Sequence, residues 1–202
     1  GKNNNFSRAL TLYQSVKPLG IQLNMHFFNA ILNATFLKGN LQTVDSILED
    51  IKKSGLKPNT VTYNTMLAGY IRFGLLDRMK PIIKEMIASK VQFSPITQTT
   101  ILQSVQLIKE NNSLLLFMEL LSTAKFIPSK IQSTQSILDI LQKGRLLIAQ
   151  QLLAYLINFG SQVGEEAFIE MLMLAGKLAN FQTIHWAKET ARGLGYNLSY
   201  YA

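Results

Sequence analysis

Glycine and short polar residues recur along this chain at a fixed interval of 35 residues, and this period constrains the fold more than any other feature. One series holds Gly39, Gly74 and Gly144, with Lys109 and Ala179 at its remaining places. A second series holds Gly20, Gly55, Lys90, Lys125, Gly160 and Gly195. Two polar series hold Asn24, Asn59, Ser94, Ser129, Gly164 and Ser199, and then Asn29, Asn64, Thr99, Thr134 and Ile169. Four series with one period indicate a repeat protein, which has no single globular core.

Each repeat contains two segments with helical periodicity. Apolar residues three and four apart predict helices over about 25–38, 41–54 and 76–89. Gly55 supplies a left-handed stop, and Pro58 follows where a helix could not continue. We expect Asp77 to cap the helix over 76–89, and Pro81 to distort that helix without breaking it. Asn-Gly and Asp-Gly turns between alternating strands are absent, so β-hairpins are not predicted.

The predicted fold class is therefore all-α. We expect an α-solenoid, a right-handed superhelix of about five and a half 35-residue helix-turn-helix repeats, because each helix pair has more apolar surface than it can cover alone. The expected domain organisation is a single repeat array over residues 1–202, with units at 1–24 (partial), 25–59, 60–94, 95–129, 130–164 and 165–199. The first unit lacks its first helix. We therefore interpret the chain as a window from a longer protein, with any targeting segment outside it.

The net charge of +8 is the bulk property that bears on function. A basic chain attracts polyanions, nucleic acid first and anionic membrane second. Net charge is +4 over residues 1–59, +3 over 60–129 and +1 over 130–202, so a polyanion should prefer the N-terminal two thirds. A general basic drift of the composition is the alternative explanation. No apolar run reaches the roughly 18 to 20 residues that span a bilayer, and the absence of cysteine excludes a disulfide framework and thiolate metal sites.

The segment VTYNTMLAGYIRFGLLDRMKPIIKEM at 61–86, with its period of 35 residues, resembles a pentatricopeptide repeat. Asn-Ala-Ile-Leu at 29–32 and Lys57-Pro58-Asn59 repeat the pattern. The resemblance covers essentially the whole chain, strongly in 25–94, less in 95–164 and faintly in 165–199. The tetratricopeptide alternative has a period of 34 residues and aromatic landmarks that are absent here. The resemblance implies single-stranded RNA binding in mitochondria, or as second choice in plastids, with one base per unit.

Short polar groups would read the base edges in such a protein. Carried over position by position, they are Asn29, Asn59, Asn64, Ser94, Thr99, Ser129 and Thr134. An Asn amide both donates and accepts, so it can meet the edge of a pyrimidine. The resemblance implies a pyrimidine for Asn29 with Asn59, and a pyrimidine with a lean to cytosine for Asn64 with Ser94. It assigns no base to Thr99 with Ser129.

Later units lose parts of this pattern, and capping offers a second explanation for the turn residues. Thr134 is paired with a glycine, and the next unit has Ile169 in place of a polar residue.

Asn and Ser at helix starts are common N-caps, which explains Asn24, Asn59 and Ser94 equally well. Inside a helix Asn is unfavourable, so Asn29 and Asn64 favour a functional role.

Two further sets would contact RNA without reading it. Base stacking would involve the residues near the starts of successive first helices, His26, Val61, Ile96 and Ile131. Phosphate contacts would come from the basic residues near the ends of those helices, Lys38, Arg72, Lys109 and Lys143. Ordinary packing explains the β-branched residues as well, and a Lys at a helix C-terminus complements the helix dipole in any case.

Catalytic and metal-binding patterns are missing from the sequence. His26 and His185 are far apart and have no partner at ligand spacing, so we expect no metal and no other cofactor. Glu165, Glu166 and Glu170 form an acidic cluster at a helix N-terminus, which suits the helix dipole better than a nuclease centre. Neither a P-loop nor a nucleophile elbow is present. We therefore expect no enzymatic activity in this segment.

Three functional hypotheses follow. The first is an organellar RNA-binding protein acting in RNA stability, processing or translation, with single-stranded RNA on units 25–94. The second is a structural scaffold in a larger mitochondrial assembly such as the mitoribosome, with a protein partner on the C-terminal units, where the polar readers fade. The third is the repeat domain of an RNA-processing enzyme whose catalytic part lies outside the segment.

Overall fold

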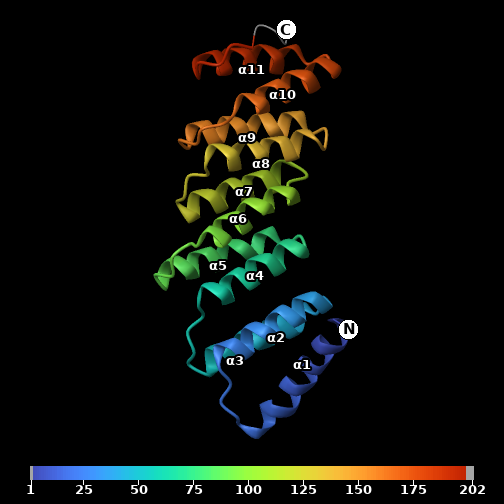
Figure 1. Cartoon of the computed structure of the whole chain (residues 1–202), viewed down its shortest axis with the longest axis vertical. Coiled ribbons are helices and arrows are strands. Elements are labelled where there is room, and N and C mark those ends of the chain that lie inside the picture. Colours follow the sequence, from blue (N-terminus) through green and yellow to red (C-terminus); the bar gives the residue numbers. More distant parts are fainter. Residues whose placement is uncertain (1, 199–202) are drawn as a thin grey trace. The chain divides into compact units, whose positions relative to one another are not determined.

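The computed structural model describes residues 2–198, with side chains from Arg8 onward. This part of the chain contains eleven α-helices, two 3-10 helices and no strand (Figure 1), which confirms the all-α fold class. None of the helices in residues 2–198 has the length and apolarity needed to cross a membrane. In chain order the elements are α1 (Lys2–Val16), η1 (Lys17–Leu19), α2 (Met25–Lys38), α3 (Leu41–Lys53), α4 (Thr60–Arg72), α5 (Leu76–Ala88), α6 (Pro95–Gln103), η2 (Ser104–Leu107), α7 (Asn111–Ala124), α8 (Lys130–Leu141), α9 (Leu146–Asn158), α10 (Glu165–Lys177) and α11 (Phe181–Gly193).

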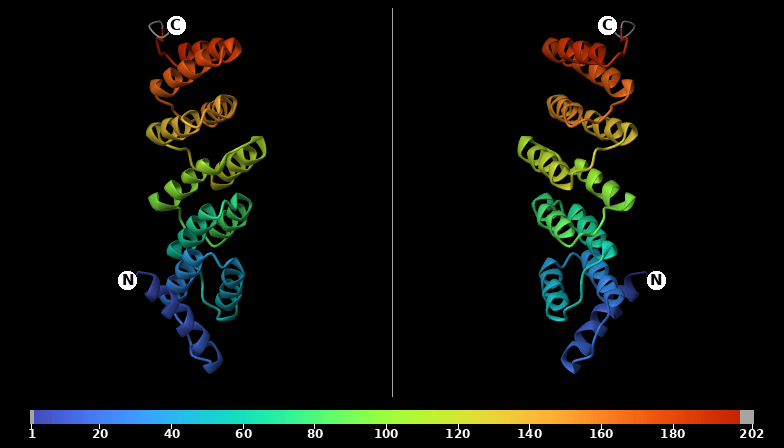
Figure 2. Two further views of the ribbon diagram at one scale, coloured as in Figure 1. Left: turned by 90° about the vertical axis from the view of Figure 1, so that its right-hand side faces the viewer. Right: turned by 90° about the vertical axis from the view of Figure 1, so that its left-hand side faces the viewer.

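The chain folds as two compact units, Gly1–Thr100 and Ile101–Ala202. In the first unit α2 packs against α1, α3 and α4, and α4 also packs against α5. In the second unit α8 packs against α9 and α10, and α10 also packs against α11 (Figure 2). The first helices of consecutive repeats are therefore neighbours within each unit. The assignment of the whole chain to one repeat array stays a prediction, and Ser199 lies outside the described residues.

The helix ends explain the glycine series of the sequence. The helices predicted over 25–38, 41–54 and 76–89 are confirmed to within one residue. All six members of the second series have a positive φ, including Lys90 at 54° and Lys125 at 52°. Each of these residues takes the left-handed conformation that follows a helix end, which glycine adopts without steric cost. The glycine series therefore repeats every 35 residues because a helix ends at that interval.

The fourth repeat departs from this scheme at Lys109. Gly39, Gly74, Gly144 and Ala179 in the same series have positive φ, whereas Lys109 does not. Here α6 ends after nine residues and continues as η2, which is followed by an extended residue, Ile108. Because the chain leaves the helix through a 3-10 turn, no left-handed stop is needed.

The start of α5 differs from the expected one. Leu75 occupies the N-cap position without a side-chain hydrogen bond, so the predicted cap by Asp77 is wrong. Asp77 lies instead in the first turn, where a carboxylate complements the helix dipole. The helix continues through Pro81 to Ala88, which confirms the expected continuity.

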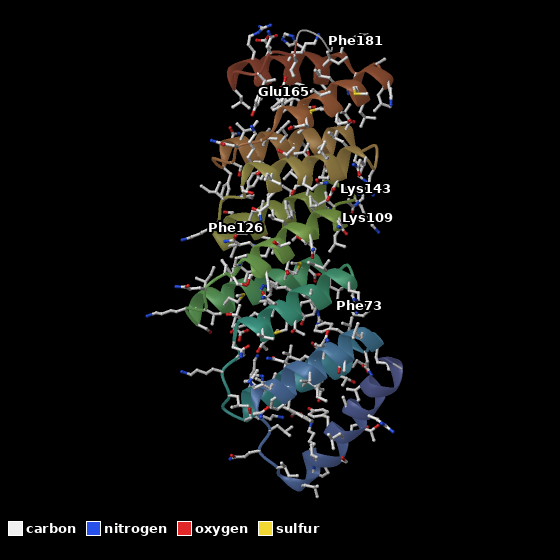
Figure 3. The ribbon with its side chains drawn as sticks, viewed as in Figure 1. Phe73, Lys109, Phe126, Lys143, Glu165 and Phe181 are labelled. Atoms are coloured by element: carbon white, nitrogen blue, oxygen red, sulfur yellow. The ribbon has the colours of Figure 1, made fainter. Side chains whose placement is uncertain are left out.

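A close approach between α2 and α4 fixes the packing of the first unit. A methyl group added to Gly69 would overlap the ring of Phe36. That ring is 2% exposed, meets Tyr70 edge-on at 5.4 Å and stacks on Phe73 at 6.4 Å (Phe73 is labelled in Figure 3). Since the ring is held on several sides, only a residue without a side chain fits at position 69.

Substitution of Gly69 by alanine tests this contact. We expect Gly69→Ala to lower the free energy of unfolding by about 1–3 kcal/mol, because overpacking outweighs the better helix propensity of alanine. The matched control is Gly176→Ala in α10, where an added methyl group meets nothing within 4 Å. That control should be neutral or stabilising by up to about 1 kcal/mol. Urea unfolding followed by circular dichroism measures both, and equal effects would contradict the packing argument.

Candidate nucleic-acid interface

A groove of about 440 Å³ runs between α2 and α4 in the first unit. We call it the α2–α4 groove. Its lining combines side-chain amides and hydroxyls with apolar surface and one cation: Asn29, Ala30, Asn33, Phe36, Val61, Asn64, Thr65, Ala68, Gly69 and Arg72. The groove thus brings together two predicted base-edge residues, a predicted stacking residue and a predicted phosphate contact.

The two base-edge amides in the groove each have an unsatisfied oxygen. The Oδ1 atoms of Asn29 and Asn64 are buried and have no hydrogen-bond partner. A buried acceptor without a partner costs about 1–3 kcal/mol. Because the terminal torsion of Asn is soft, a rotation of the amide can turn the oxygen toward a donor placed in the groove. These amides are therefore suited to accept a hydrogen bond from a ligand.

The structure also brings Asn64 to its predicted partner. The Nδ2 group of Asn64 donates to Ser94 Oγ over a long 3.5 Å. Ser94 lies 30 residues away in the sequence, directly before α6, and its Oγ accepts from the backbone N–H of Thr97 at 3.2 Å. The link joins Asn64, which lines the groove, to the residue that precedes α6.

The turn residues of the polar series are helix caps in this structure. Asn59 Oδ1 accepts from the N–H of Thr62, whose hydroxyl oxygen accepts from the N–H of Asn59. Ser129 and Gln132 form the same reciprocal box at the start of α8. Asn24 caps α2 by accepting from Phe27. The capping explanation is thus correct for these residues, and any contact of Asn59 or Ser129 with RNA stays a prediction.

The predicted stacking residues all project toward solvent. Val61 is 58% exposed, Ile96 67% and Ile131 82%, and His26 is exposed as well. Each lies in the first turn of its helix. Ordinary core packing therefore does not account for these side chains. Among them, Val61 lines the α2–α4 groove.

The predicted phosphate contacts differ in their surroundings. Arg72 is exposed at the last position of α4 and lines the groove, and Lys38 is exposed at the last position of α2. Lys109 and Lys143 are exposed in loops at one edge of the second unit (Figure 3). The Nζ group of Lys143 donates a hydrogen bond to the backbone carbonyl of Gln106 at 3.2 Å, so one of its N–H groups already has a partner within the protein.

The base-edge series changes character after Asn64. Thr99 is exposed on α6. Thr134 is 9% exposed, and its hydroxyl donates to the carbonyl of Lys130 and accepts from the N–H of Gly164 at 2.7 Å. That hydroxyl already uses its donor and one acceptor position within the protein. A base-reading role for Thr134 stays a prediction that would require breaking a buried hydrogen bond.

Sequence reasoning missed two polar residues of the groove. Asn33 is exposed and lies one helical turn after Asn29, and Thr65 directly follows Asn64. Residues four apart on a helix share a face, so the position of Asn29 was itself the signal for Asn33.

Metal-binding geometry is not found in the described part of the chain. Within residues 2–198 there is no group of three or more His, Cys, Asp or Glu side chains that could hold an ion. The acidic Glu165 and Glu166 lie in the first turn of α10 (Glu165 is labelled in Figure 3). The α2–α4 groove itself contains amides, hydroxyls and a guanidinium. This chemistry suits hydrogen bonding and anion contact.

Comparison with known proteins identifies the family. Models described as "Pentatricopeptide repeat domain" and "PPR repeat" match residues 11–71 and 61–91. Over residues 11–91 the chain matches the pentatricopeptide repeat family. A chloroplastic pentatricopeptide repeat-containing protein of Arabidopsis thaliana is 40% identical over 68 residues, which are 34% of this chain and 10% of that protein. A second pentatricopeptide repeat-containing protein of the same plant is 34% identical over 77 residues, 38% of this chain and 13% of that one. The chain thus spans about a tenth of the length of these relatives.

A solved structure of a pentatricopeptide repeat protein shows the same fold. The crystal structure of PPR10 from maize matches 95% of this chain and 27% of its own, with a TM-score of 0.60 and 16% sequence identity. PPR10 has also been solved in complex with an 18-nucleotide psaJ RNA element, and that structure aligns with a TM-score of 0.46 and 14% identity over 96% of this chain and 37% of its own.

The hydrogen bond between Thr134 and Gly164 can be tested by an isosteric change. We expect Thr134→Val to lower the free energy of unfolding by about 1–3 kcal/mol, because it leaves the buried N–H of Gly164 unpaired. The matched control is Thr190→Val, since the Thr190 hydroxyl makes the same bond to its own helix, at the carbonyl of Trp186, but satisfies no buried N–H. The control should change stability by less than about 0.5 kcal/mol. If urea unfolding gave the same midpoint for both variants, the hydrogen bond to Gly164 would not contribute measurably to stability.

Proposed function

We propose that this segment binds single-stranded RNA, with the α2–α4 groove as the site for one base. The observation that carries the proposal is the pair of buried, unpartnered amide oxygens of Asn29 and Asn64 in a groove open to a ligand. An orphaned acceptor is favourable only if a donor satisfies it in the functional state. Nucleobase edges supply N–H donors and carbonyl acceptors together, which matches the two-sided hydrogen bonding of an Asn amide.

The groove offers distinct surfaces to the different parts of a nucleotide. Val61 is an exposed apolar side chain beside Asn64 and can cover the face of an unstacked base. Asn64, joined to Ser94, faces the base edge. The proposed preference is a pyrimidine at both units of 25–94, with a lean to cytosine at the unit of Asn64 and Ser94.

Arg72 serves the sugar-phosphate backbone in this proposal. Eight residues separate it from Asn64, which corresponds to about 12 Å along a helix. A guanidinium at that distance lies beyond the base held at Asn64 but within the same groove, where it suits an adjoining phosphate. The charge distribution agrees, because residues 1–59 and 60–129 carry +4 and +3 of the total charge of +8.

The relatives support the class of ligand and an organellar setting. PPR10, whose fold this chain shares, is the protein solved with an 18-nucleotide RNA element. Several of the matching relatives are named chloroplastic. We propose an organellar role in RNA stability, processing or translation, without catalysis by this segment. Import of the full-length precursor into isolated mitochondria and chloroplasts distinguishes the mitochondrion, our first choice, from the plastid.

The affinity of this segment alone should be modest. Base stacking on a protein contributes roughly 1–3 kcal/mol per base. Two units with intact Asn readers therefore give weak binding, and a longer array supplies the remainder. Measurements on this chain should use low salt, because phosphate contacts weaken steeply as salt increases.

Removal of the Asn64 amide tests the base contact. We expect Asn64→Ala to weaken binding of a cytosine- and uracil-containing single-stranded RNA about 2- to 10-fold, which corresponds to a hydrogen bond of roughly 0.5–1.5 kcal/mol. Asn158→Ala, at an exposed position of α9, is the matched control and should bind as the parent chain does. Fluorescence anisotropy measures both. An unchanged affinity in Asn64→Ala would remove the base-edge role of this residue.

Neutralisation of Arg72 tests the phosphate contact. In Arg72→Gln the slope of log K against log salt concentration should become shallower by about 0.7, the value for one phosphate contact on a single strand. The preference among bases should not change, since a phosphate contact carries no sequence information. Lys84→Gln removes the same charge from an exposed position of α5 and serves as control. A slope reduced equally by both variants would show a general charge effect instead of a contact.

A further inference from the structure

A second groove, of about 420 Å³, lies between α8 and α10 in the second unit. We call it the α8–α10 groove. It is lined by Leu138, Leu141, Gln142, Glu166, Ile169 and Glu170. Like the α2–α4 groove, it lies between the first helices of consecutive repeats.

The two grooves use the same repeat positions but opposite chemistry. Three periods of 35 residues relate Asn33, Val61, Asn64 and Thr65 to Leu138, Glu166, Ile169 and Glu170, respectively. The polar edge group at Asn64 is thus replaced by the isoleucine of the later repeat. The exposed apolar residue in the first turn of α4 is replaced by the carboxylate of Glu166.

This exchange makes the α8–α10 groove unsuitable for RNA. Glu166 would place a negative charge where a base face should lie, and Glu170 adds a second one a helical turn away. Like charges repel a phosphate backbone, and Ile169 offers no hydrogen bond to a base edge. The period equivalent of Arg72 is Lys177, which is exposed but does not line this groove.

The chemistry of the groove does fit another kind of ligand. Among the residues described by the structure, Glu166 and Glu170 have no ion-pair partner, whereas Asp45, Asp50 and Glu189 each pair with a Lys or Arg. Each of the two helices also carries an exposed apolar side chain outside the groove. On the face of α8 that carries Leu138, Ile131 is 82% exposed, and on the face of α10 that carries Ile169, Met173 is 49% exposed.

We propose that the α8–α10 groove docks a basic amphipathic helix of a partner protein. Leu or Ile side chains of that helix would pack on Leu138, Leu141 and Ile169, and two of its Lys or Arg side chains would pair with Glu166 and Glu170. The two carboxylates are four residues apart on α10, so the matching basic residues stand one helical turn apart on the partner. Insertion of an amphipathic helix into an apolar groove is an established mode of peptide recognition. The site is separate from the α2–α4 groove, and its test does not depend on RNA binding.

The experiment titrates the 202-residue chain into two labelled synthetic peptides. Both have Leu on one helical face, and the opposite face carries Lys in one peptide and Glu in the other. We expect the Lys peptide to bind at least about tenfold more tightly, because charge complementarity favours it. Equal binding of the two peptides would overturn the inference.

Two double variants place the binding in the groove. Glu166→Gln with Glu170→Gln should weaken binding of the Lys peptide at least about fivefold, since two close charge pairs are lost. The control, Glu49→Gln with Asp77→Asn, changes the net charge equally at two exposed positions of the first unit and should have no effect. Equal losses in both double variants would show non-specific attraction and refute the site.

Two further measurements complete the test. Ile169→Asn restores the polar residue of the earlier repeats and should also weaken binding of the Lys peptide, with circular dichroism confirming that the helices are retained. Binding of the pyrimidine RNA should be unchanged by Glu166→Gln with Glu170→Gln. If that double variant altered RNA binding and left peptide binding unchanged, the groove would belong to RNA and the inference would be wrong.

Discussion

No helix pair in this chain can cover its own apolar face, and the rest of the structure depends on this constraint. In the first unit α4 packs between α2 and α5, which leaves Tyr63 and Leu67 at 1% and 0% exposure. Burial of large side chains of this kind stabilises by roughly 1.5–3 kcal/mol each. Because packing fixes the orientation of α4, Asn64 and Arg72 are both held along the α2–α4 groove.

Polar groups in this fold fall into two classes, and the difference indicates where a ligand belongs. Most of the turn residues are satisfied by caps, as Asn59 and Ser129 are. Thr134 satisfies the buried N–H of Gly164, the N-cap residue of α10. Asn29, Asn64, Ser133 and Ser161 keep a buried side-chain oxygen without a partner, and of these only the two Asn residues line the α2–α4 groove. Both lie inside helices, where Asn has no structural advantage. Natural proteins retain such costs mainly at functional sites.

The repeat architecture allows one chain to carry two kinds of surface. The packing positions of each unit stay apolar, so the stack forms whatever occupies the groove positions. Asn64 and Ile169 hold the same groove position three repeats apart, and each is compatible with the same helix pair. A basic, amide-lined groove and an acidic, apolar groove can therefore exist in one scaffold without a change of fold. Both proposed functions depend on the groove residues, which the same kind of scaffold supports.

Helix boundaries were predictable because they depend on neighbours in the sequence. The left-handed stop at Gly55 and the first turn after Asn24 involve atoms only a few residues apart. The start of α5 was mispredicted because Asp77 is a good capping residue by type, yet the chain begins its helix one residue earlier. Lys109 has its place in the glycine series, but the 3-10 turn before it removes the need for a left-handed residue.

The sequence alone determined the period, the helices and the candidate reader positions, since each follows from residue type and spacing along the chain. Only the tertiary structure decided which polar groups were already satisfied. The bonds of Asn64 to Ser94 and of Thr134 to Gly164 each span 30 residues, and they form only when the first helix of a repeat packs against the turn that ends the same repeat. Whether a buried oxygen has a hydrogen-bond partner depends on the residues packed around it. Those neighbours are distant in the sequence, so a local sequence pattern does not reveal them.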